Sequence, residues 1–268
     1  MPGCDLDLLR DAALAAGEIA GRYFRQAFDV RDKGDGQGPV TEADIEIDRM
    51  LRADLLAARP GYGWLSEETE DSAARLSRER VFIVDPIDGT RSFVNGDKTF
   101  AHSLAVAEAG RVVAACVHLP MRGLTYAAAL GEGAFLNGEP LRGSRRAGIE
   151  AADVLAARPQ LEPGLWPGGV PPVTRHFRSS LAYRLCLTAQ GRFDGMVTLR
   201  DAWEWDIAAG DLICREAGVT ITDRLGAALR FNNPVPKQAG VLAGGAAVHA
   251  GFLRHLVPTG LSNARPIP

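Results

Sequence analysis

The sequence predicts an α+β fold whose second part is of the α/β type, and three patterns along its 268 residues support this. Apolar residues at three- and four-residue spacing in the first sixty positions predict two helices. Short apolar runs separated by turns then predict an antiparallel sheet. After about position 150, strand-like and helix-like segments alternate, which favours a three-layer unit with a mixed, mostly parallel sheet. We therefore expect two closely packed halves, residues 1–148 and 149–268.

The N-terminal half begins with two amphipathic helices. The first is predicted over about residues 5–28, and a polar, glycine-rich loop follows over 31–39. The second helix is predicted over about 42–58, where a Pro-Gly pair ends it. Residues 66–80 are polar and charged, which predicts a loop or an exposed helix.

Strand signals follow from Val81 onward. An apolar run starting there predicts a buried strand, and a meander is expected after it. The meander strands are predicted at Ser103–Val106, Val112–Leu119, Leu124–Ala129 and Ala134–Leu136. The C-terminal half is expected to hold strands at Val154–Ala157, Phe193–Leu199 and Val219–Thr222, and helices at Ser180–Gln190 and Asp206–Ala217. Gly218 would close the last of these helices.

The composition is that of an ordinary globular protein. The chain is 46% hydrophobic and 24% charged, with a net charge of −3 and a pI of about 6.0. No basic run suggests a nucleic-acid polymer as partner, and no apolar stretch is long enough to predict a transmembrane helix. The N-terminus lacks the basic region of a secretory signal, and four scattered cysteines favour free thiols. We therefore expect a cytoplasmic protein.

The end of the strand that starts at Val81 carries unusual chemistry. Asp85 and Asp88 follow the apolar run directly, and Gly89 and Thr90 come next. Two ionised carboxylates 4 Å apart in a partly dry site would repel by roughly 4 kcal/mol at an effective dielectric near 20. A positive charge is expected between them. Two hard oxygen ligands followed by backbone N–H groups favour Mg²⁺ beside a phosphate.

Three further acidic motifs have ordinary structural explanations when each is taken alone. Thr41 and Asp44 have the spacing of a helix capping box. Glu67 and its neighbour Glu68 are typical of a solvated surface. Asp206 is a suitable N-cap for the helix that it begins.

Together the motifs are far more specific. The ordered segments GPVTEAD, SEE, VDPIDGTRSF and WDIAAGDLICREAG resemble the inositol monophosphatase family of magnesium-dependent, lithium-sensitive phosphatases. The resemblance runs from the first helix to about Gly245. It implies a layered α-β-α-β-α sandwich, with an antiparallel sheet in the N-terminal half and a mixed, mostly parallel sheet in the C-terminal half. A homodimer is also compatible with it.

The resemblance implies a role for each acidic motif. Asp85 would bridge two of the two or three Mg²⁺ ions, and Li⁺ would inhibit. The implied metal ligands are Glu67, Asp85, the Ile87 carbonyl, Asp88 and Asp206. Phosphate would be bound by Asp88, Gly89 and Thr90, the last two through backbone N–H groups. Asp44, Thr90 and Glu67 would be the catalytic residues that activate a water molecule for direct attack on phosphorus, with no covalent enzyme intermediate. Lys33 matches a lysine that the family places near the metals.

The substrate is less well defined by the sequence. Inositol-specific members carry a glutamate seven residues before the position of Asp206, where this chain has Leu199. A shift of register would let Asp201 or Glu204 replace it. Ser180, Arg200 and Asp201 are further candidate substrate contacts.

A broad inositol- or sugar-phosphate monoesterase is the first interpretation, and a 3′(2′),5′-bisphosphate nucleotidase is the main alternative. For the nucleotidase, Arg178, Arg184 or Arg200 would bind a second phosphate, and Trp203 would stack on a base. Histidinol phosphatase comes next. An inactive metal- or phosphate-binding regulatory module is the alternative from a different class.

Overall fold

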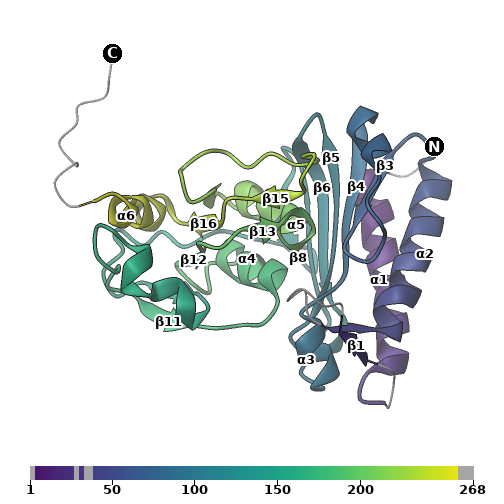
Figure 1. Cartoon of the computed structure of the whole chain (residues 1–268), viewed down its shortest axis with the longest axis horizontal. Coiled ribbons are helices and arrows are strands. Elements are labelled where there is room, and N and C mark those ends of the chain that lie inside the picture. Colours follow the sequence, from purple (N-terminus) through teal and green to yellow (C-terminus); the bar gives the residue numbers. More distant parts are fainter. Residues whose placement is uncertain (1–3, 27–29, 33–38, 259–268) are drawn as a thin grey trace.

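The computed structural model describes residues 4–26, 30–32 and 39–258. Figure 1 shows five layers from right to left: a helix pair, a large sheet, a second helix pair, a smaller sheet and a final helix. This is the predicted α-β-α-β-α sandwich. Within the described residues, no helix is long and apolar enough to cross a membrane.

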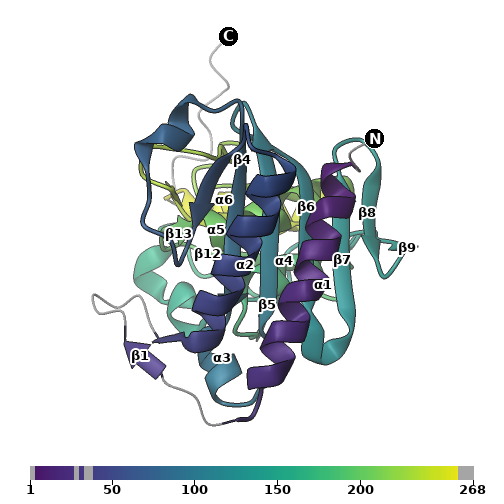
Figure 2. The same ribbon diagram turned by 90° about the vertical axis from the view of Figure 1, so that its right-hand side faces the viewer.

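The first layer consists of α1 (Asp5–Tyr23) and α2 (Glu42–Ala58), which lie side by side over the outer face of the large sheet (Figure 2). The predicted bounds of the second helix are confirmed. The first helix was predicted to reach residue 28 but ends at Tyr23, because the backbone of Phe24 leaves the helical conformation. The Phe24 ring packs against Phe93 and Phe100 with centroids 6.1 and 5.8 Å away, so tertiary packing ends the helix.

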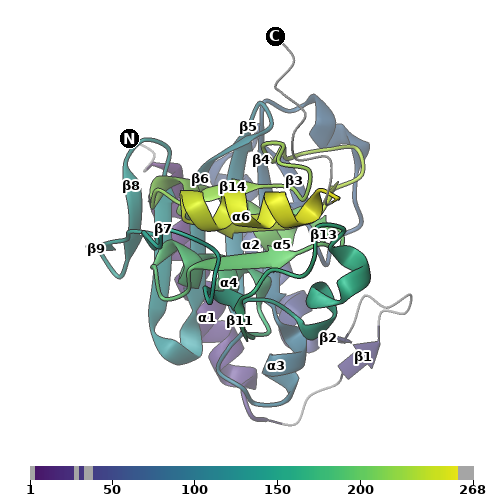
Figure 3. The ribbon, with the colours of Figure 1, turned by 90° about the vertical axis from the view of Figure 1, so that its left-hand side faces the viewer.

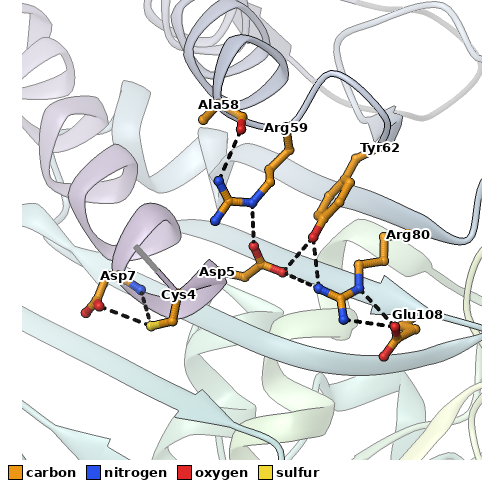
Figure 4. Close-up of polar contacts among 8 residues, drawn as sticks. All are labelled: Cys4, Asp5, Asp7, Ala58, Arg59, Tyr62, Arg80 and Glu108. Atoms are coloured by element: carbon orange, nitrogen blue, oxygen red, sulfur yellow. Dashed lines mark hydrogen bonds and ion pairs between the residues drawn. The ribbon is translucent and has the colours of Figure 1, made fainter. Parts of the chain in front are cut away.

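A partly buried ion cluster fastens both helices to the sheet. Figure 4 shows the Asp5 carboxylate at the start of α1 accepting hydrogen bonds from Arg59, Tyr62 and Arg80. Arg59 follows the end of α2, and Arg80 begins β4 and also pairs with Glu108. Three segments that are distant in sequence therefore meet at one carboxylate.

The second layer is a seven-stranded sheet in the order β3-β4-β5-β6-β7-β8-β9. All neighbouring strands pair antiparallel except β3, which runs parallel to β4 and was not predicted. The bounds are β3 Gly63–Ser66, β4 Arg80–Asp88, β5 Ala101–Glu108, β6 Arg111–Leu119, β7 Leu124–Ala129, β8 Gly133–Leu136 and β9 Glu139–Pro140. The predicted meander is confirmed.

The third and fourth layers are α4 (Leu181–Ala189) with α5 (Glu204–Glu216), and a sheet in the order β11-β10-β12-β16-β14. The pairings give four strands one direction and β16 the opposite one, as predicted for a mixed, mostly parallel sheet. The strands are β10 Asp153–Leu155, β11 Thr174–His176, β12 Gly195–Thr198, β14 Thr220–Thr222 and β16 Val241–Gly244. Helix α6 (Ala246–Leu256), not predicted, covers the far face (Figure 3).

Short elements complete the described chain. Positions 31, 32 and 39, predicted as loop, lie instead in an antiparallel pair of short strands, where Arg31 faces Val40. A second such pair joins β13 to β15. The bounds are β1 Val30–Asp32, β2 Pro39–Thr41, β13 Ala202–Trp203, β15 Lys237–Gln238 and α3 Thr90–Val94, with 3-10 helices η1 Ala73–Ser77, η2 Pro120–Arg122, η3 Arg158–Leu161 and η4 Pro163–Leu165.

Three apolar clusters separate the layers. One lies between α1, α2 and the large sheet, and another between the smaller sheet and α6. The largest joins both sheets through α4 and α5, so it draws residues from both sides of position 148. The division into halves 1–148 and 149–268 stays a prediction.

Candidate metal centre

The candidate site begins where β4 is irregular. Its antiparallel pairing with β5 is regular up to Asp85 and resumes one residue out of step at Asp88. Pro86 lies in this β-bulge, where its missing N–H leaves no ladder bond unmade. The Pro86 carbonyl accepts a hydrogen bond from His102 Nδ1 at 2.5 Å, and burial lowers the pKa of His102 to about 3. A neutral histidine therefore supports the turn between the two aspartates.

Glu67, Asp85 and Asp206, which we call the acidic trio, converge at this bulge. Each offers a carboxylate oxygen within 4.8 Å of the others. Glu67 follows β3 and its backbone N–H donates to the Val84 carbonyl of β4, whereas Asp206 lies in the first turn of α5. The helix starts two residues before the prediction, so Asp206 is not its N-cap. Three segments of the chain thus deliver three carboxylates to one point.

Asp85 is the central member of the trio. It is 1% exposed, and neither carboxylate oxygen has a hydrogen-bond partner among the described residues. Burial raises the pKa of Asp85 well above its usual value, and the nearby charges of Glu67, Asp88 and Asp206 raise it further. Asp206 lies close enough to Asp85 for a proton on one carboxylate to bond to the other. When both carboxylates are ionised, that hydrogen bond cannot form. The unpartnered oxygens of Asp85, with two further carboxylates beside them, are hard donors that fit a divalent cation.

Asp88, at the end of β4, is better supplied with donors. Its Oδ2 accepts hydrogen bonds from Ser180 Oγ and from the backbone N–H of Ala182, both at 2.6 Å. Ser180 also caps α4 by accepting from the N–H of Tyr183. Burial raises the pKa of Asp88 to about 6, although these hydrogen bonds counteract part of the effect. Ser180, predicted as a substrate contact, here orients a carboxylate.

The Asp44–Thr90 pair has the predicted partners. Asp44 Oδ2 accepts from both the backbone N–H and the hydroxyl of Thr41, which completes the capping box of α2. The Thr90 hydroxyl lies 3.4 Å from Asp44 Oδ1 and 3.0 Å from the Ile87 carbonyl. The structural and the functional interpretations of Asp44 are therefore compatible.

Gly89 connects β4 to α3 in a conformation that suits glycine. Its φ is +96°, and an added Cβ would lie 3.4 Å from the Thr99 carbonyl oxygen and 3.5 Å from the Ser180 Cβ. These are ordinary van der Waals contacts, so a side chain here is disfavoured by the positive φ and not by lack of space. The turn therefore brings the backbone of Gly89 and Thr90 next to Asp88.

A pocket of about 210 Å³ adjoins the acidic trio. Its lining includes Arg200 and Asp201, two of the predicted substrate contacts, along with Trp203. Leu199 is 7% exposed and packs in the apolar cluster under α6, so it does not line this pocket. Lys33 lies outside the described residues.

Two residues named for the nucleotidase alternative are already engaged. The Arg184 guanidinium donates to the carbonyls of Arg178 and Ser179. The Trp203 ring stacks on Trp205 at 4.6 Å, and Lys237 Nζ lies 3.9 Å from its centroid. These contacts engage two of the residues named for the nucleotidase, whereas Arg200, a third, lines the pocket.

Comparison with known proteins identifies the family. The model of the inositol monophosphatase family matches residues 4–259. The chain belongs to this family. An inositol-1-monophosphatase of Rhizobium meliloti strain 1021 is 34% identical over 98% of this chain and 97% of its own length. A fructose-1,6-bisphosphatase/inositol-1-monophosphatase of Thermotoga maritima is 36% identical over 77% of this chain and 80% of that protein.

The fold is shared as well. A solved IMPase from Thermotoga maritima superposes with a TM-score of 0.80 at 28% identity, covering 94% of this chain and 96% of that one. Membership of the inositol monophosphatase family confirms the resemblance, the layered fold and the class of enzyme, a metal-dependent phosphoric monoester hydrolase.

Sequence reasoning missed two polar residues beside the inositol monophosphatase motifs. The bond from His102 to the Pro86 carbonyl was not predicted, because it depends on the β4–β5 register. Glu204 was considered a substitute substrate contact, but it is fully buried and its carboxylate accepts hydrogen bonds from Asn232 and Asn233. Its position two residues before Asp206 was the only feature of the sequence that pointed to Glu204.

Proposed function

We propose that this protein is a Mg²⁺-dependent phosphomonoesterase that releases phosphate from an inositol- or sugar-phosphate substrate by direct attack of water. The observation that carries the proposal is the acidic trio, in which the buried Asp85 carboxylate lacks any hydrogen-bond donor among the described residues. Such a carboxylate is stable in its ionised form only beside a cation. The reaction class, hydrolysis of a phosphoric monoester, follows from membership of the family.

Two or three Mg²⁺ ions would be held by the trio together with its neighbours in β4. The proposed ligands are Glu67, Asp85, the Ile87 carbonyl, Asp88 and Asp206. The Thr90 hydroxyl donates to the Ile87 carbonyl, which has a second lone pair for a cation. Bound Mg²⁺ would lower the pKa of a water molecule and neutralise charge on the phosphate. Li⁺ is expected to inhibit at the same site.

The remaining residues position the phosphate and move a proton. Gly89 and Thr90 present backbone N–H groups beside Asp88, where phosphate oxygens would bind. The Thr90 hydroxyl has one hydrogen, which can turn from the Ile87 carbonyl to Asp44 Oδ1, and its oxygen can then accept a proton from the water; the other Asp44 oxygen is fixed by Thr41. Glu67 would act with this pair to orient and deprotonate the attacking water. No nucleophilic side chain is required.

The leaving group would occupy the pocket lined by Arg200 and Asp201. A cation and an anion side by side suit a polyhydroxylated leaving group, which both donates and accepts hydrogen bonds. The engagement of Arg184 and Trp203 counts against the bisphosphate nucleotidase, for which Arg200 is the candidate in this pocket to bind a second phosphate. Relatives whose names include inositol-1-monophosphatase agree with this order. A cytoplasmic location and a homodimer stay predictions.

The test compares kcat/KM for inositol 1-phosphate, adenosine 3′,5′-bisphosphate and histidinol phosphate, with Mg²⁺ and with a chelator. We expect phosphate release that requires Mg²⁺ and favours inositol 1-phosphate. A preference of about a hundredfold corresponds to roughly 2.7 kcal/mol of differential transition-state binding. A comparable preference for either of the other two substrates would show that the proposed leaving group is wrong. No release from any of them would favour the binding module.

A further inference from the structure

A second buried carboxylate lies two residues before Asp206. Glu204 is the first residue of α5 and is 0% exposed. Its Oε2 accepts a hydrogen bond from the backbone N–H of Asn232 at 2.6 Å. Its Oε1 accepts two from Asn233, at 3.0 Å from the backbone N–H and 2.6 Å from Nδ2. The carboxylate is therefore held by three donors from one loop.

The same two asparagines are bound from the other side by Arg75. This side chain is buried, and its Nη1 donates to Asn232 Oδ1 at 2.6 Å while its Nη2 donates to the Asn233 carbonyl at 2.9 Å. Asn232 Nδ2 donates back to the Arg75 carbonyl. Asp71 fixes the guanidinium with two bonds of 2.6 and 2.8 Å. We call Arg75, Asn232, Asn233 and Glu204 the Glu204 network.

Arg75 packs against the strand that delivers Glu67. A Cβ on Gly63, at the start of β3, would lie 3.1 Å from the Arg75 Cβ, so glycine permits this close approach. Glu67 directly follows β3, and Asp206 lies in the first turn of the helix that Glu204 begins. The Glu204 network thus connects β3, which precedes Glu67, to the start of α5, which carries Asp206. With the contact between the two carboxylates, this makes a closed ring.

This ring acts on groups that repel each other. Glu67 and Asp206 are acidic, and each raises the pKa of Asp85 through its charge. Without a cation their repulsion favours separation of β3 from α5, and the bonds of the Glu204 network oppose that separation. Groups behind metal ligands commonly set the ligands' positions, and their loss weakens metal affinity or activity by about 10- to 100-fold.

We propose that Glu204 and Arg75 are positioning residues that hold the Asp206 carboxylate beside Glu67 and so preorganise the metal centre. The inference rests on the proposed function, because it assumes that the acidic trio binds Mg²⁺. Neither residue contacts the substrate in this account. Their effect is on the spacing of two ligands that come from different layers of the fold.

The test measures Mg²⁺ binding by titration calorimetry to the metal-free wild type and to Glu204→Gln, with Asp211→Asn as the matched control. Asp211 is also buried in α5 and pairs with Arg215 at 3.0 Å, away from the trio. We expect Glu204→Gln to raise the Mg²⁺ dissociation constant about 10- to 100-fold, and Asp211→Asn to lower thermal stability while changing the constant by less than about twofold. Excess Mg²⁺ should restore most of kcat in Glu204→Gln.

If Glu204→Gln fails to fold, Asn233→Ala decides the question, because it removes the amide that donates to Glu204 and to the Arg230 carbonyl but keeps both backbone N–H bonds to Glu204. It should weaken Mg²⁺ binding about three- to tenfold. Wild-type affinity in the folded variant, together with a lowered melting temperature, would show a merely structural network and overturn the inference. A wild type that binds no Mg²⁺ would instead refute the proposed function.

Discussion

The acidic trio and the Glu204 network each contain an almost fully buried carboxylate, Asp85 near the end of β4 and Glu204 at the start of α5, yet the surroundings of the two are opposite. Glu204 accepts three hydrogen bonds, whereas Asp85 accepts none from the described residues. Burial raises the pKa of both, and hydrogen bonds from Asn232 and Asn233 counteract this only for Glu204. Burial alone therefore does not identify a site; the supply of donors distinguishes a structural carboxylate from a ligand.

The largest expected effect comes from Asp85→Asn. Losing the proposed ligand Asp85 should remove about 4 kcal/mol of transition-state stabilisation, or roughly a thousandfold in rate. Phosphate release at saturating Mg²⁺ measures it. In a chelator the variant should melt no lower than the wild type, because a charge without donors has been removed. Retention of near-normal turnover would mean that Asp85 is not a ligand.

Thr90→Ala tests whether the pair with Asp44 takes part in catalysis. We expect kcat to fall about a hundredfold, the lower range for loss of general acid-base assistance, with Mg²⁺ affinity changed much less. Thr90→Ser keeps the hydroxyl and is the matched control, for which most of the activity should remain. Equal kcat values for the two variants would assign Thr90 a packing role only.

Ser180→Ala tests Asp88, whose carboxylate has fewer hydrogen-bond donors than Glu204 and more than Asp85. Asp88 Oδ2 would keep the Ala182 N–H and lose the Ser180 hydroxyl. We expect Mg²⁺ affinity to fall roughly tenfold, and stability to fall by about 1 kcal/mol through the lost cap of α4. Ser144→Ala, which removes a similar bond to Asp194 at 2.5 Å, is the control. An equal effect of both variants on Mg²⁺ binding would contradict the role given to Ser180.

Asp201→Asn should have the smallest effect. Asp201 is exposed and pairs with Arg224 at 2.9 Å, and surface pairs contribute about 0–1 kcal/mol to stability. Because it lines the pocket beside the trio, KM for inositol 1-phosphate should rise a few-fold while kcat stays near the wild-type value. Thermal melting and steady-state kinetics separate the two effects. A large fall in kcat would move Asp201 into the catalytic group.

Much of the candidate site could be predicted from the sequence because its residues lie in short contiguous motifs. The apolar run of β4 ends in Asp85, Asp88 and Gly89, so local pattern and chemistry coincide there. Asp44 and Thr41 were also predictable, since a capping box depends on residues three positions apart. The convergence of Glu67 and Asp206 on Asp85 needed the family resemblance, because no local rule brings β3, β4 and α5 together.

The features that the sequence did not predict depend on partners far along the chain. Glu204 finds its donors about thirty residues later, and Phe24 ends α1 because of rings at positions 93 and 100. Leu199 was considered as a substrate contact by counting from Asp206, yet its side chain packs under α6. Spacing along the chain does not show which face of β12 or of its following loop a side chain will occupy.

Calorimetric titration of the metal-free protein with Mg²⁺, repeated in buffers of different ionisation enthalpy, tests the central claim most directly. The raised pKa values of Asp85, Asp206 and Asp88, the last about 6, mean that the folded metal-free protein retains protons that a cation must displace. Binding should therefore release protons near pH 6, release fewer at pH 8, and tighten as pH rises between them. Asp85→Asn should abolish most of this signal. Proton-independent binding, or binding unchanged in Asp85→Asn, would contradict the assignment of the acidic trio as the metal centre.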